Sequence, residues 1–465
     1  MSVAGRLIMD RSEVLARIRR SLFYGTANYT KNQPDLFVPH RFRMLAPSQM
    51  DDFVLELRAN LPEDEILLYV HFPFCFSECL FCNSFPHQAE RGVQREYLRC
   101  LLREIEILAG SGLFAGKRAK GVYFGGGTPT SFSNDDLGAV LAKLQASLDF
   151  VEGCSITSEA HPATLAAAGR IEGLREIGIN RLSVGCQTFD QKVLGICNRS
   201  NTEKQLGEIV KAVQGAGLAI NIDMMTGLPG QTLEGVRRDL EILAGIRPDA
   251  VEYIRHEIVN PLVVELYRKN PEIVVDSDTL FAMVCMTQEW MAAQGYEQNG
   301  SFSNDRQWGY RYHWLHEMPI IAFGSRARSY TKTICYDKHE ELSTYLNIVN
   351  KGFLPVGRYL TLSHKDQMYR ALLLGLQLKS GIEVRRFRQR FALEPREVFA
   401  PLLASLEELG CLEQADGFVR LTEYGAYFVE DVCDFITDAA LQEESTALTR
   451  APHSEGGTSS RLRLD

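Results

Sequence analysis

Three cysteines have a spacing that could hold a soft metal centre. Cys75, Cys79 and Cys82 follow the pattern C-x3-C-x2-C directly after the apolar run 66–70, so a strand ending there would bring their thiolates together in one loop. A structural zinc site needs four ligands, whereas three thiolates can hold a [4Fe–4S] cluster and leave one iron open to another ligand. The alternative is that all three are ordinary buried thiols. The spacing favours the cluster with an open iron.

The elements that must position this loop alternate between strands and helices. From residue 66 onward, short β-branched runs are each followed by an amphipathic helix, which is typical of βα units with a parallel sheet. Six units are too few to close an eight-stranded barrel. Ligands of parallel α/β folds bind at the carboxyl ends of the strands, where the motifs described below also fall. The expected strands are Ile66–His71, Gly121–Phe124, Ser155–Glu159, Arg181–Val184, Ala219–Met224 and Ala250–Ile254.

Three regions lie outside these units. Residues 1–65 predict an N-terminal extension of helical pieces, such as 11–20. Residues 336–440 predict an α+β module in which helices at 366–379, 384–391 and 398–409 precede a hairpin at 411–422. This order is winged-helix-like, and without a basic recognition helix a role as a cap or docking domain is favoured over DNA binding. Residues 441–465 predict a disordered tail.

Length, charge and cysteine content narrow the class of protein. A chain of 465 residues is long enough for two or three domains, and its net charge of −9 without a long basic block argues against nucleic acid as a partner. The chain contains no apolar segment of membrane-spanning length, and its start lacks the apolar run of a signal peptide. Eleven scattered cysteines indicate reduced thiols. These features predict a soluble, cytoplasmic protein.

The cysteine loop resembles that of radical S-adenosylmethionine (SAM) enzymes. The pattern Tyr69-x-His71-x-Pro-Phe before the three cysteines is similar to the branch of oxygen-independent coproporphyrinogen III oxidase, and the resemblance runs from about residue 67 to residue 435. It implies an α/β fold with a partial (β/α)6 barrel at 66–335 and a C-terminal winged-helix-like cap. It also implies that Cys75, Cys79 and Cys82 hold a [4Fe–4S] cluster, which cleaves SAM to a 5′-deoxyadenosyl radical.

Further motifs carry the residues that the resemblance places around SAM. A Gly-Gly-Gly-Thr-Pro turn at 125–129 would contact the methionine end of SAM, because glycines let the backbone approach a ligand closely. Later segments resemble the R-x-S-x-G-x-Q and N-x-D-x-x-x-G-L-P-x-Q-T elements of the family. The candidate SAM-binding residues are Gly125, Gly126, Gly127, Thr128, Glu159, Gln187, Arg199 and Asp223. An arginine suits a carboxylate and an aspartate suits ribose hydroxyls.

Some of these residues have competing interpretations. Tyr69, His71 and Glu159 are the candidate catalytic residues; Tyr69 also suits an aromatic core, and Glu159 also suits a solvated loop. Cys186 could be a fourth cluster ligand, but its place on a strand far along the chain favours a packed core thiol.

The substrate is less well defined than the cofactors. Among the relatives implied by the resemblance, the oxidase proper has a further cysteine two positions after the third ligand, where this chain has Ser84. Class C radical SAM methyltransferases and a haem-trafficking relative lack that cysteine too. The aromatic residues between 296 and 330 suit either a flat conjugated substrate or an aromatic core. Arg326 and Arg328 replace the small residues usual in this turn among porphyrin relatives, and they indicate a substrate adapted away from haem precursors that bears an anionic group.

Three functional hypotheses follow. The favoured one is class C transfer of a methyl or methylene group from a second SAM to an sp2 carbon of an aromatic or heteroaromatic molecule, by methylation or cyclopropanation. Proton abstraction would then fall to His161, His313 or Glu297. The alternatives are an oxidative decarboxylase like coproporphyrinogen III oxidase and a haem-binding chaperone. The expected partners are a planar small molecule and an electron donor of the flavodoxin or ferredoxin type, with neither nucleic acid nor a membrane.

Overall fold

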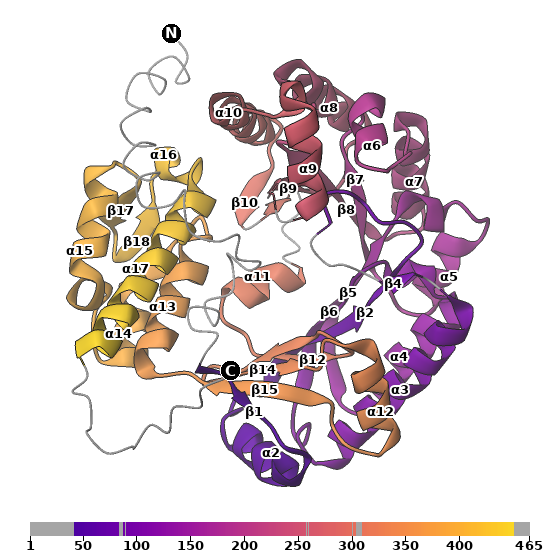
Figure 1. Ribbon diagram of the computed structural model, residues 1–465, viewed down its shortest axis with the longest axis vertical. Coiled ribbons are helices and arrows are strands. Elements are labelled where there is room, and N and C mark those ends of the chain that lie inside the picture. Colours follow the sequence, from indigo (N-terminus) through magenta and orange to yellow (C-terminus); the bar gives the residue numbers. More distant parts are fainter. Residues whose placement is uncertain are drawn as a thin grey trace, which may run out of the picture.

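The computed structural model describes residues 41–82, 87–88, 90–256, 258, 260–299, 301–303 and 309–450. Figure 1 shows a large curved sheet with helices on its outer side and a smaller, mostly helical module (orange to yellow) beside it. The predicted helix at 11–20, Ser84 and the last fifteen residues of the predicted tail, 451–465, lie outside the described residues.

The large body is one sheet with the strand order β1-β15-β14-β13-β12-β2-β5-β6-β7-β8-β9-β11-β10. Its strands are β1 (Arg43–Met44), β2 (Glu65–Phe72), β5 (Arg118–Gly126), β6 (Asp149–Ala160), β7 (Arg181–Gln187), β8 (Ala219–Thr226), β9 (Ala250–Arg255), β10 (Glu297–Asn299), β11 (Ser301–Ser303), β12 (Ile320–Phe323), β13 (Arg328–Tyr330), β14 (Ile334–Lys338) and β15 (Val356–Thr361). The six expected strands are β2 and β5 to β9, and each pairs in parallel with its neighbour, as in a partial (β/α)6 barrel. β12 adds a further parallel strand beside β2.

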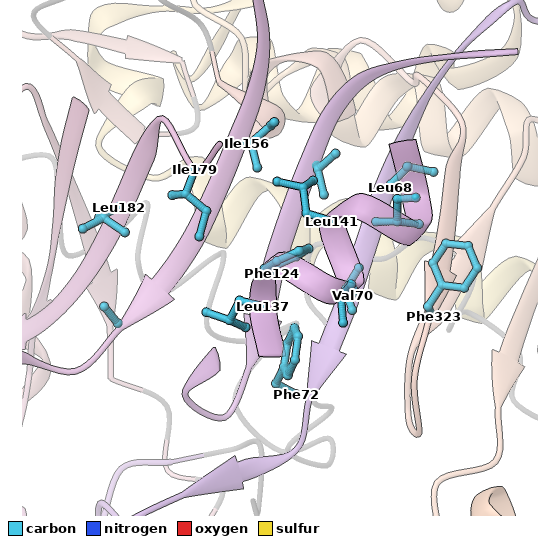
Figure 2. Close-up of a cluster of buried hydrophobic side chains, with 14 of the residues drawn as sticks. Leu68, Val70, Phe72, Phe124, Leu137, Leu141, Ile156, Ile179, Leu182 and Phe323 are labelled. Carbon is cyan, nitrogen blue, oxygen red and sulfur yellow. The ribbon is translucent and has the colours of Figure 1, made fainter. Parts of the chain in front are cut away.

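Alternation along the strands separates an apolar outer face from a polar inner one. Leu68, Val70 and Phe72 of β2 point outward and are fully buried, together with Phe124 of β5 (Figure 2). They pack with the apolar side of the covering helices, including Leu137 of α4 (Asn134–Gln145). Each such side chain contributes about 1.5–3 kcal/mol by leaving water. The other side of the same strands is therefore free to carry chemistry.

Helices connect the strands, and several begin at side-chain caps. Ser133 with Asp136 forms a capping box at the start of α4, Thr202 caps α7 (Glu203–Gly215) and Thr232 caps α8 (Leu233–Ile246). The helices of the large body are α2 (Met50–Ala59), α3 (Arg91–Gly110), α4, α5 (Arg170–Glu176), α6 (Gln191–Ile196), α7 (Glu203–Gly215), α8 (Leu233–Ile246), α9 (Pro261–Lys269), α10 (Ser277–Ala293), α11 (Tyr310–Leu315) and α12 (Leu342–Asn350). No helix in the described ranges is both long and apolar enough to cross a bilayer.

The C-terminal module has the order of a winged helix and its own hydrophobic core. Its elements are α13 (His364–Gly375), β16 (Ile382–Glu383), α14 (Val384–Phe391), α15 (Pro395–Glu408), β17 (Leu412–Ala415), β18 (Phe418–Leu421), α16 (Glu423–Ala426) and α17 (Val429–Arg450). It docks on the large body where Phe281 of α10 stacks on Phe428 at 4.9 Å and where Arg255 pairs with Glu430 and Asp431 at 2.8 and 3.0 Å.

Two predicted domain boundaries and the predicted content of the N-terminal extension differ from the structure. The barrel region does not end at residue 335, because β14 and β15 continue its sheet to Thr361, and the module begins with α13. Residues 41–65 are not only helical, since β1 pairs with β15 at the edge of the sheet. The tail does not begin at residue 441, because α17 continues to Arg450.

Candidate active site

The parallel register gathers the predicted residues at the carboxyl edge of the sheet, on its inner face. His71 of β2 pairs with Gly125 of β5, Glu159 of β6 pairs with Ser183 of β7, and Gly185 pairs with Asp223 of β8. Because side chains alternate along a strand, Tyr69 and His71 point to the same face. Residues from five separate motifs therefore share one site.

The cysteine loop leaves β2 at this edge. All three cysteines are half-buried, Cys75 Sγ lies 3.2 Å from Thr128 Oγ1, and Arg199 donates to Cys79 Sγ at 3.4 Å. Within the described ranges, no three His, Cys, Asp or Glu side chains converge closely enough to hold a single ion. Three thiols along one loop suit the expected cluster rather than a single ion, because each thiolate would bind a different iron.

The glycine turn packs directly on the cysteine loop. A Cβ on Gly126, whose φ is +114°, would lie 2.6–2.9 Å from the ring of His71, and a Cβ on Gly127 would lie 2.6 Å from the carbonyl of Phe74. The N–H of Gly127 donates to Phe72 O at 2.8 Å, and that of Gly126 donates to Glu159 Oε2 at 3.0 Å. These two amides are used within the protein, so the glycines serve close packing rather than offering free donors.

Tyr69 and His71 form a hydrogen-bonded pair below the turn. Tyr69 Oη lies 3.0 Å from His71 Nδ1. Burial, with a smaller effect of the Arg326 charge, lowers the pKa of His71 to about 3, so its imidazole is neutral. Burial also raises the pKa of Tyr69 well above its ordinary value, so the phenol keeps its proton. The Tyr69 hydroxyl and Nδ1 of the neutral imidazole thus form one hydrogen bond, which orients the ring of His71.

Two buried carboxyl groups lie on the same inner face. Glu159 accepts from Tyr123 Oη at 2.9 Å, and Asp223 accepts from Ser183 Oγ at 3.0 Å and Asn221 Nδ2 at 2.6 Å. Burial raises the pKa of Glu159 to about 7, with the Asp223 charge adding to the rise. Burial and then the Glu252 charge raise the pKa of Asp223 to about 7. These groups can exchange protons near neutral pH.

Gln187 and Arg199 complete the site. Gln187 is 8% exposed, and its Oε1 has no hydrogen-bond partner. Arg199 reaches across to the carbonyl of Gly185 at 2.5 Å as well as to Cys79. An unpaired buried acceptor is costly, so Oε1 of Gln187 is a group that a bound ligand can satisfy. This acceptor, the three thiols and the polar inner face fit a [4Fe–4S] cluster with SAM.

The structure separates other predicted residues from this site. His313 lies by Lys120 and Glu65, at the opposite end of the strands, and Glu297 is exposed on β10 at the edge of the sheet. Neither is placed to abstract a proton near the cysteine loop. His161 accepts from the N–H of Ala163 at 3.1 Å, and burial, with a smaller effect of the Arg199 charge, lowers its pKa to about 4. Cys186 is fully buried in the core.

Sequence reasoning missed several residues of the inner face. Tyr123 lies between Tyr69 and Tyr310 of α11, with ring centroids 6.2 and 5.2 Å away. Leu315, at the other end of α11, packs with Leu374 of α13, so this helix bridges β5 and the C-terminal module (Figure 1). Arg311, also on α11, forms an ion pair with Glu252 of β9. Tyr123 could have been found from its position two residues before the glycine turn, which puts it on the same face as Gly125. The sequence contains no comparable signal for Arg311.

The buried Glu159 predicts a pH-dependent stability. Its pKa rises on folding from 4.5 to about 7, so the folded state binds more protons than the unfolded state between these values. The free energy of unfolding should therefore fall as pH rises from about 4.5 to 7. Glu159→Gln resembles the protonated acid, so between pH 5 and pH 8 its unfolding free energy should fall by about 1–3 kcal/mol less than that of the wild type. Urea denaturation of the cluster-free proteins at several pH values measures this difference. An equal fall of the unfolding free energy with pH in both proteins would contradict the prediction.

Comparisons with known proteins follow the same division of the chain. Residues 69–243 match the radical SAM superfamily, and residues 362–428 match the HemN C-terminal domain. An oxygen-independent coproporphyrinogen III oxidase from Pseudomonas aeruginosa is 27% identical over 397 residues, covering 79% of this chain and 84% of the relative. An anaerobilin synthase from Escherichia coli is 27% identical over 83% of this chain and 86% of the relative. The heme chaperone HemW from Bacillus subtilis is 27% identical over 78% of this chain and 97% of the relative.

One solved structure shares the fold over most of both chains. Coproporphyrinogen III oxidase (HemN) from Escherichia coli aligns with a TM-score of 0.73 at 23% identity, covering 83% of this chain and 92% of the other. The relatives named here are oxidases, an anaerobilin synthase and a chaperone, and their similarity spans both domains. They contradict the class C methyltransferase hypothesis and favour the oxidase-like alternative.

Proposed function

Because this chain belongs to the radical SAM superfamily, in its coproporphyrinogen oxidase-like branch, we propose that it is an enzyme that acts on a tetrapyrrole. The reaction that we propose is oxidative decarboxylation like that of the oxygen-independent oxidase. The observation that carries the proposal is the shared edge of the sheet. There the cysteine loop, the glycine turn, Glu159, Gln187 and Asp223 face one side.

Different side chains would hold the cluster and SAM. Cys75, Cys79 and Cys82 would hold a [4Fe–4S] cluster, and Gln187 and Asp223 would hold polar groups of SAM. When bound, the cluster and SAM supply an electron and a 5′-deoxyadenosyl radical.

The remaining residues handle protons and line the inner face. The hydroxyl of Tyr69 contacts Nδ1 of His71 and orients its imidazole. Glu159, with a pKa of about 7, can hold or release a proton at neutral pH. The rings of Tyr69, Tyr123 and Tyr310 line the inner face, with centroids 6.2 and 5.2 Å from that of Tyr123. They offer an aromatic surface for the rings of a tetrapyrrole.

A second candidate is a haem-binding chaperone of the same branch. Ser84 replaces the further cysteine expected of the oxidase, and the chain is similar to a heme chaperone over most of its length. Such a protein would bind haem tightly with little turnover.

Anaerobic reconstitution with iron, sulfide, SAM and dithionite tests the proposal. Coproporphyrinogen III and haem are supplied separately, and the products are analysed by mass spectrometry. The proposal expects 5′-deoxyadenosine together with a tetrapyrrole that has lost CO2. Retention of haem without turnover would favour the chaperone, whereas a linear tetrapyrrole would favour an activity like the relative named anaerobilin synthase.

The SAM stoichiometry and the electron donor are separate parts of the proposal. We propose that two SAM molecules bind, and titration of the reconstituted protein with SAM counts them; saturation at one equivalent would contradict this. We further propose a flavodoxin- or ferredoxin-type donor. Replacing dithionite with either reduced protein should sustain formation of 5′-deoxyadenosine.

Gln187 should affect stability and SAM affinity in opposite directions. Gln187→Leu removes the buried Oε1 that has no partner, so the ligand-free protein should keep its stability or gain about 1 kcal/mol. The same change should weaken SAM binding about tenfold, because the ligand loses a hydrogen bond in a buried site. Calorimetric titration with SAM and urea denaturation measure the two effects. Unchanged SAM affinity would remove Gln187 from the site.

A further inference from the structure

One hydroxyl from the helix layer reaches the backbone of the candidate site. Tyr97 of α3 is fully buried, and its Oη donates to the backbone carbonyl of His71 at 2.6 Å. Burial raises the pKa of Tyr97 well above its ordinary value, so the hydroxyl keeps the proton that it donates. Tyr97 lies in the apolar core between the sheet and its helices, whereas the imidazole of His71 belongs to the site. The hydrogen bond therefore connects the core with the site.

The strand next to β2 ends where this hydrogen bond is made. β12 pairs in parallel with β2 as far as Phe323, which lies opposite Val70, and the chain then turns at Gly324. The ladder thus stops one residue before His71. A Cβ on Gly324, whose φ is +98°, would lie less than 3.0 Å from both His71 O and Tyr97 Oη. Only glycine leaves room there for the hydroxyl, which takes the place of a ladder partner.

The ring of Tyr97 also contacts the start of the cysteine loop. It packs edge-on against Phe74, the residue before Cys75, with ring centroids 5.4 Å apart. The carbonyl of Phe74 accepts from the N–H of Thr128 in the glycine turn at 2.8 Å, and Thr128 Oγ1 lies 3.2 Å from Cys75 Sγ. Tyr97 thus supports the chain from His71 to the first cysteine, where the cysteine loop meets the glycine turn.

We propose that Tyr97 is a positioning residue, whose hydroxyl fixes the backbone of His71 and thereby the cysteine loop against the glycine turn. The inference rests on the proposed function, because it concerns the place where SAM would be cleaved. Tyr97 acts through His71 and Phe74, both of which it contacts. Without its hydroxyl, the carbonyl of His71 loses this partner and the end of the strand can shift. A displacement of about 1 Å can cost about 100-fold in rate where groups must meet in a defined geometry.

Tyr345 offers a matched control. It is fully buried on α12, its ring centroid lies 5.5 Å from that of Tyr97, and its Oη donates to Glu104 Oε2 at 2.8 Å. When that hydroxyl is removed, Glu104 still has its ion pair with Lys338. Tyr97→Phe and Tyr345→Phe thus each remove one buried hydroxyl from neighbouring rings, but only the first removes a hydrogen bond to His71.

The two variants and the wild type are reconstituted anaerobically with iron and sulfide. Iron content and the midpoint of urea denaturation report on folding, and the rate of 5′-deoxyadenosine formation is measured against SAM concentration with dithionite. Tyr97→Phe should keep its iron and have the same urea midpoint as Tyr345→Phe. Its rate at saturating SAM should fall about tenfold, and its half-saturating SAM concentration should change less than about twofold. The electron paramagnetic resonance spectrum of the reduced cluster with SAM should change in Tyr97→Phe alone.

The contrary outcomes are distinct from one another. A wild-type rate in Tyr97→Phe would overturn the inference, and so would equal losses of rate in both variants, which would indicate a general loss of packing. Loss of iron in Tyr97→Phe would assign the residue to the fold alone and would also overturn the inference. A wild-type protein that holds its cluster but forms no 5′-deoxyadenosine would overturn the proposed function, and the inference with it.

Discussion

Replacing Cys79 with alanine is expected to abolish both the iron–sulfur absorbance of the reconstituted protein and the formation of 5′-deoxyadenosine. Cys79 is the middle member of the cysteine loop, and its sulfur accepts from the guanidinium of Arg199 at 3.4 Å. A cluster held by three thiolates has no spare protein ligand, so loss of one leaves two irons without a thiolate. The expected effect on 5′-deoxyadenosine is loss to background, measured by liquid chromatography after anaerobic incubation with SAM and dithionite.

Cys154→Ala is the matched control for this experiment. Cys154 is also a free cysteine, but it is buried on the outer side of β6 and faces the helices. Its replacement removes a thiol without touching the loop, and the iron content and 5′-deoxyadenosine yield should match the wild type. A full cluster in Cys79→Ala would show that the ligand assignment is wrong. Equal losses in both variants would indicate a general folding defect.

Replacing Lys338 with methionine is expected to cost about 3–5 kcal/mol of unfolding free energy. Lys338 Nζ and Glu104 Oε1 are 2.7 Å apart, and neither side chain is exposed to solvent. Glu104 also accepts from the N–H of Gly324 and from Tyr345 Oη, at 2.9 and 2.8 Å. Without Lys338, the carboxylate would remain buried with no opposite charge. The midpoint and slope of urea denaturation measure the loss.

A double variant and an exposed pair sharpen this test. Lys338→Met combined with Glu104→Gln removes both charges and should recover most of the lost stability, because no charge is left unpaired. Lys204→Met removes one partner of the exposed pair Lys204–Glu208, whose side chains are 86% and 68% exposed, and should have no measurable effect. If Lys338→Met is no worse than Lys204→Met, the buried pair does not stabilise the fold.

The Lys338–Glu104 pair also connects stability with the site. The carboxylate of Glu104 accepts a hydrogen bond from the N–H of Gly324, and the turn that begins at Gly324 lies against His71. Breaking the pair should therefore disturb the rim of the site as well as the fold, and any loss of activity in Lys338→Met must be read together with its loss of stability.

The sequence alone determined the parallel strands and the residues that face the site. The runs at 66–71 and 219–224 correspond to β2 and β8, because every second residue, which faces the covering helices, is apolar in both. The cysteine loop was found from its spacing, and the glycine turn was found from its resemblance to the family's Gly-Gly-Gly-Thr-Pro element. The winged-helix order of the C-terminal module also followed from local periodicity. Local patterns are sufficient where a single element carries the signal.

Only the tertiary structure decided which residues meet across elements. Glu104 and Lys338 are far apart in the sequence, and each alone looks like a surface residue, yet folding buries them together. His313 and Glu297 were plausible bases by type, but the register of the strands placed them away from the cysteine loop. Gln187 was predicted by its motif, whereas its unpaired Oε1 depends on the packing of neighbouring strands. Partner choice, burial and pKa depend on groups brought together by the whole chain, so a local pattern cannot supply them.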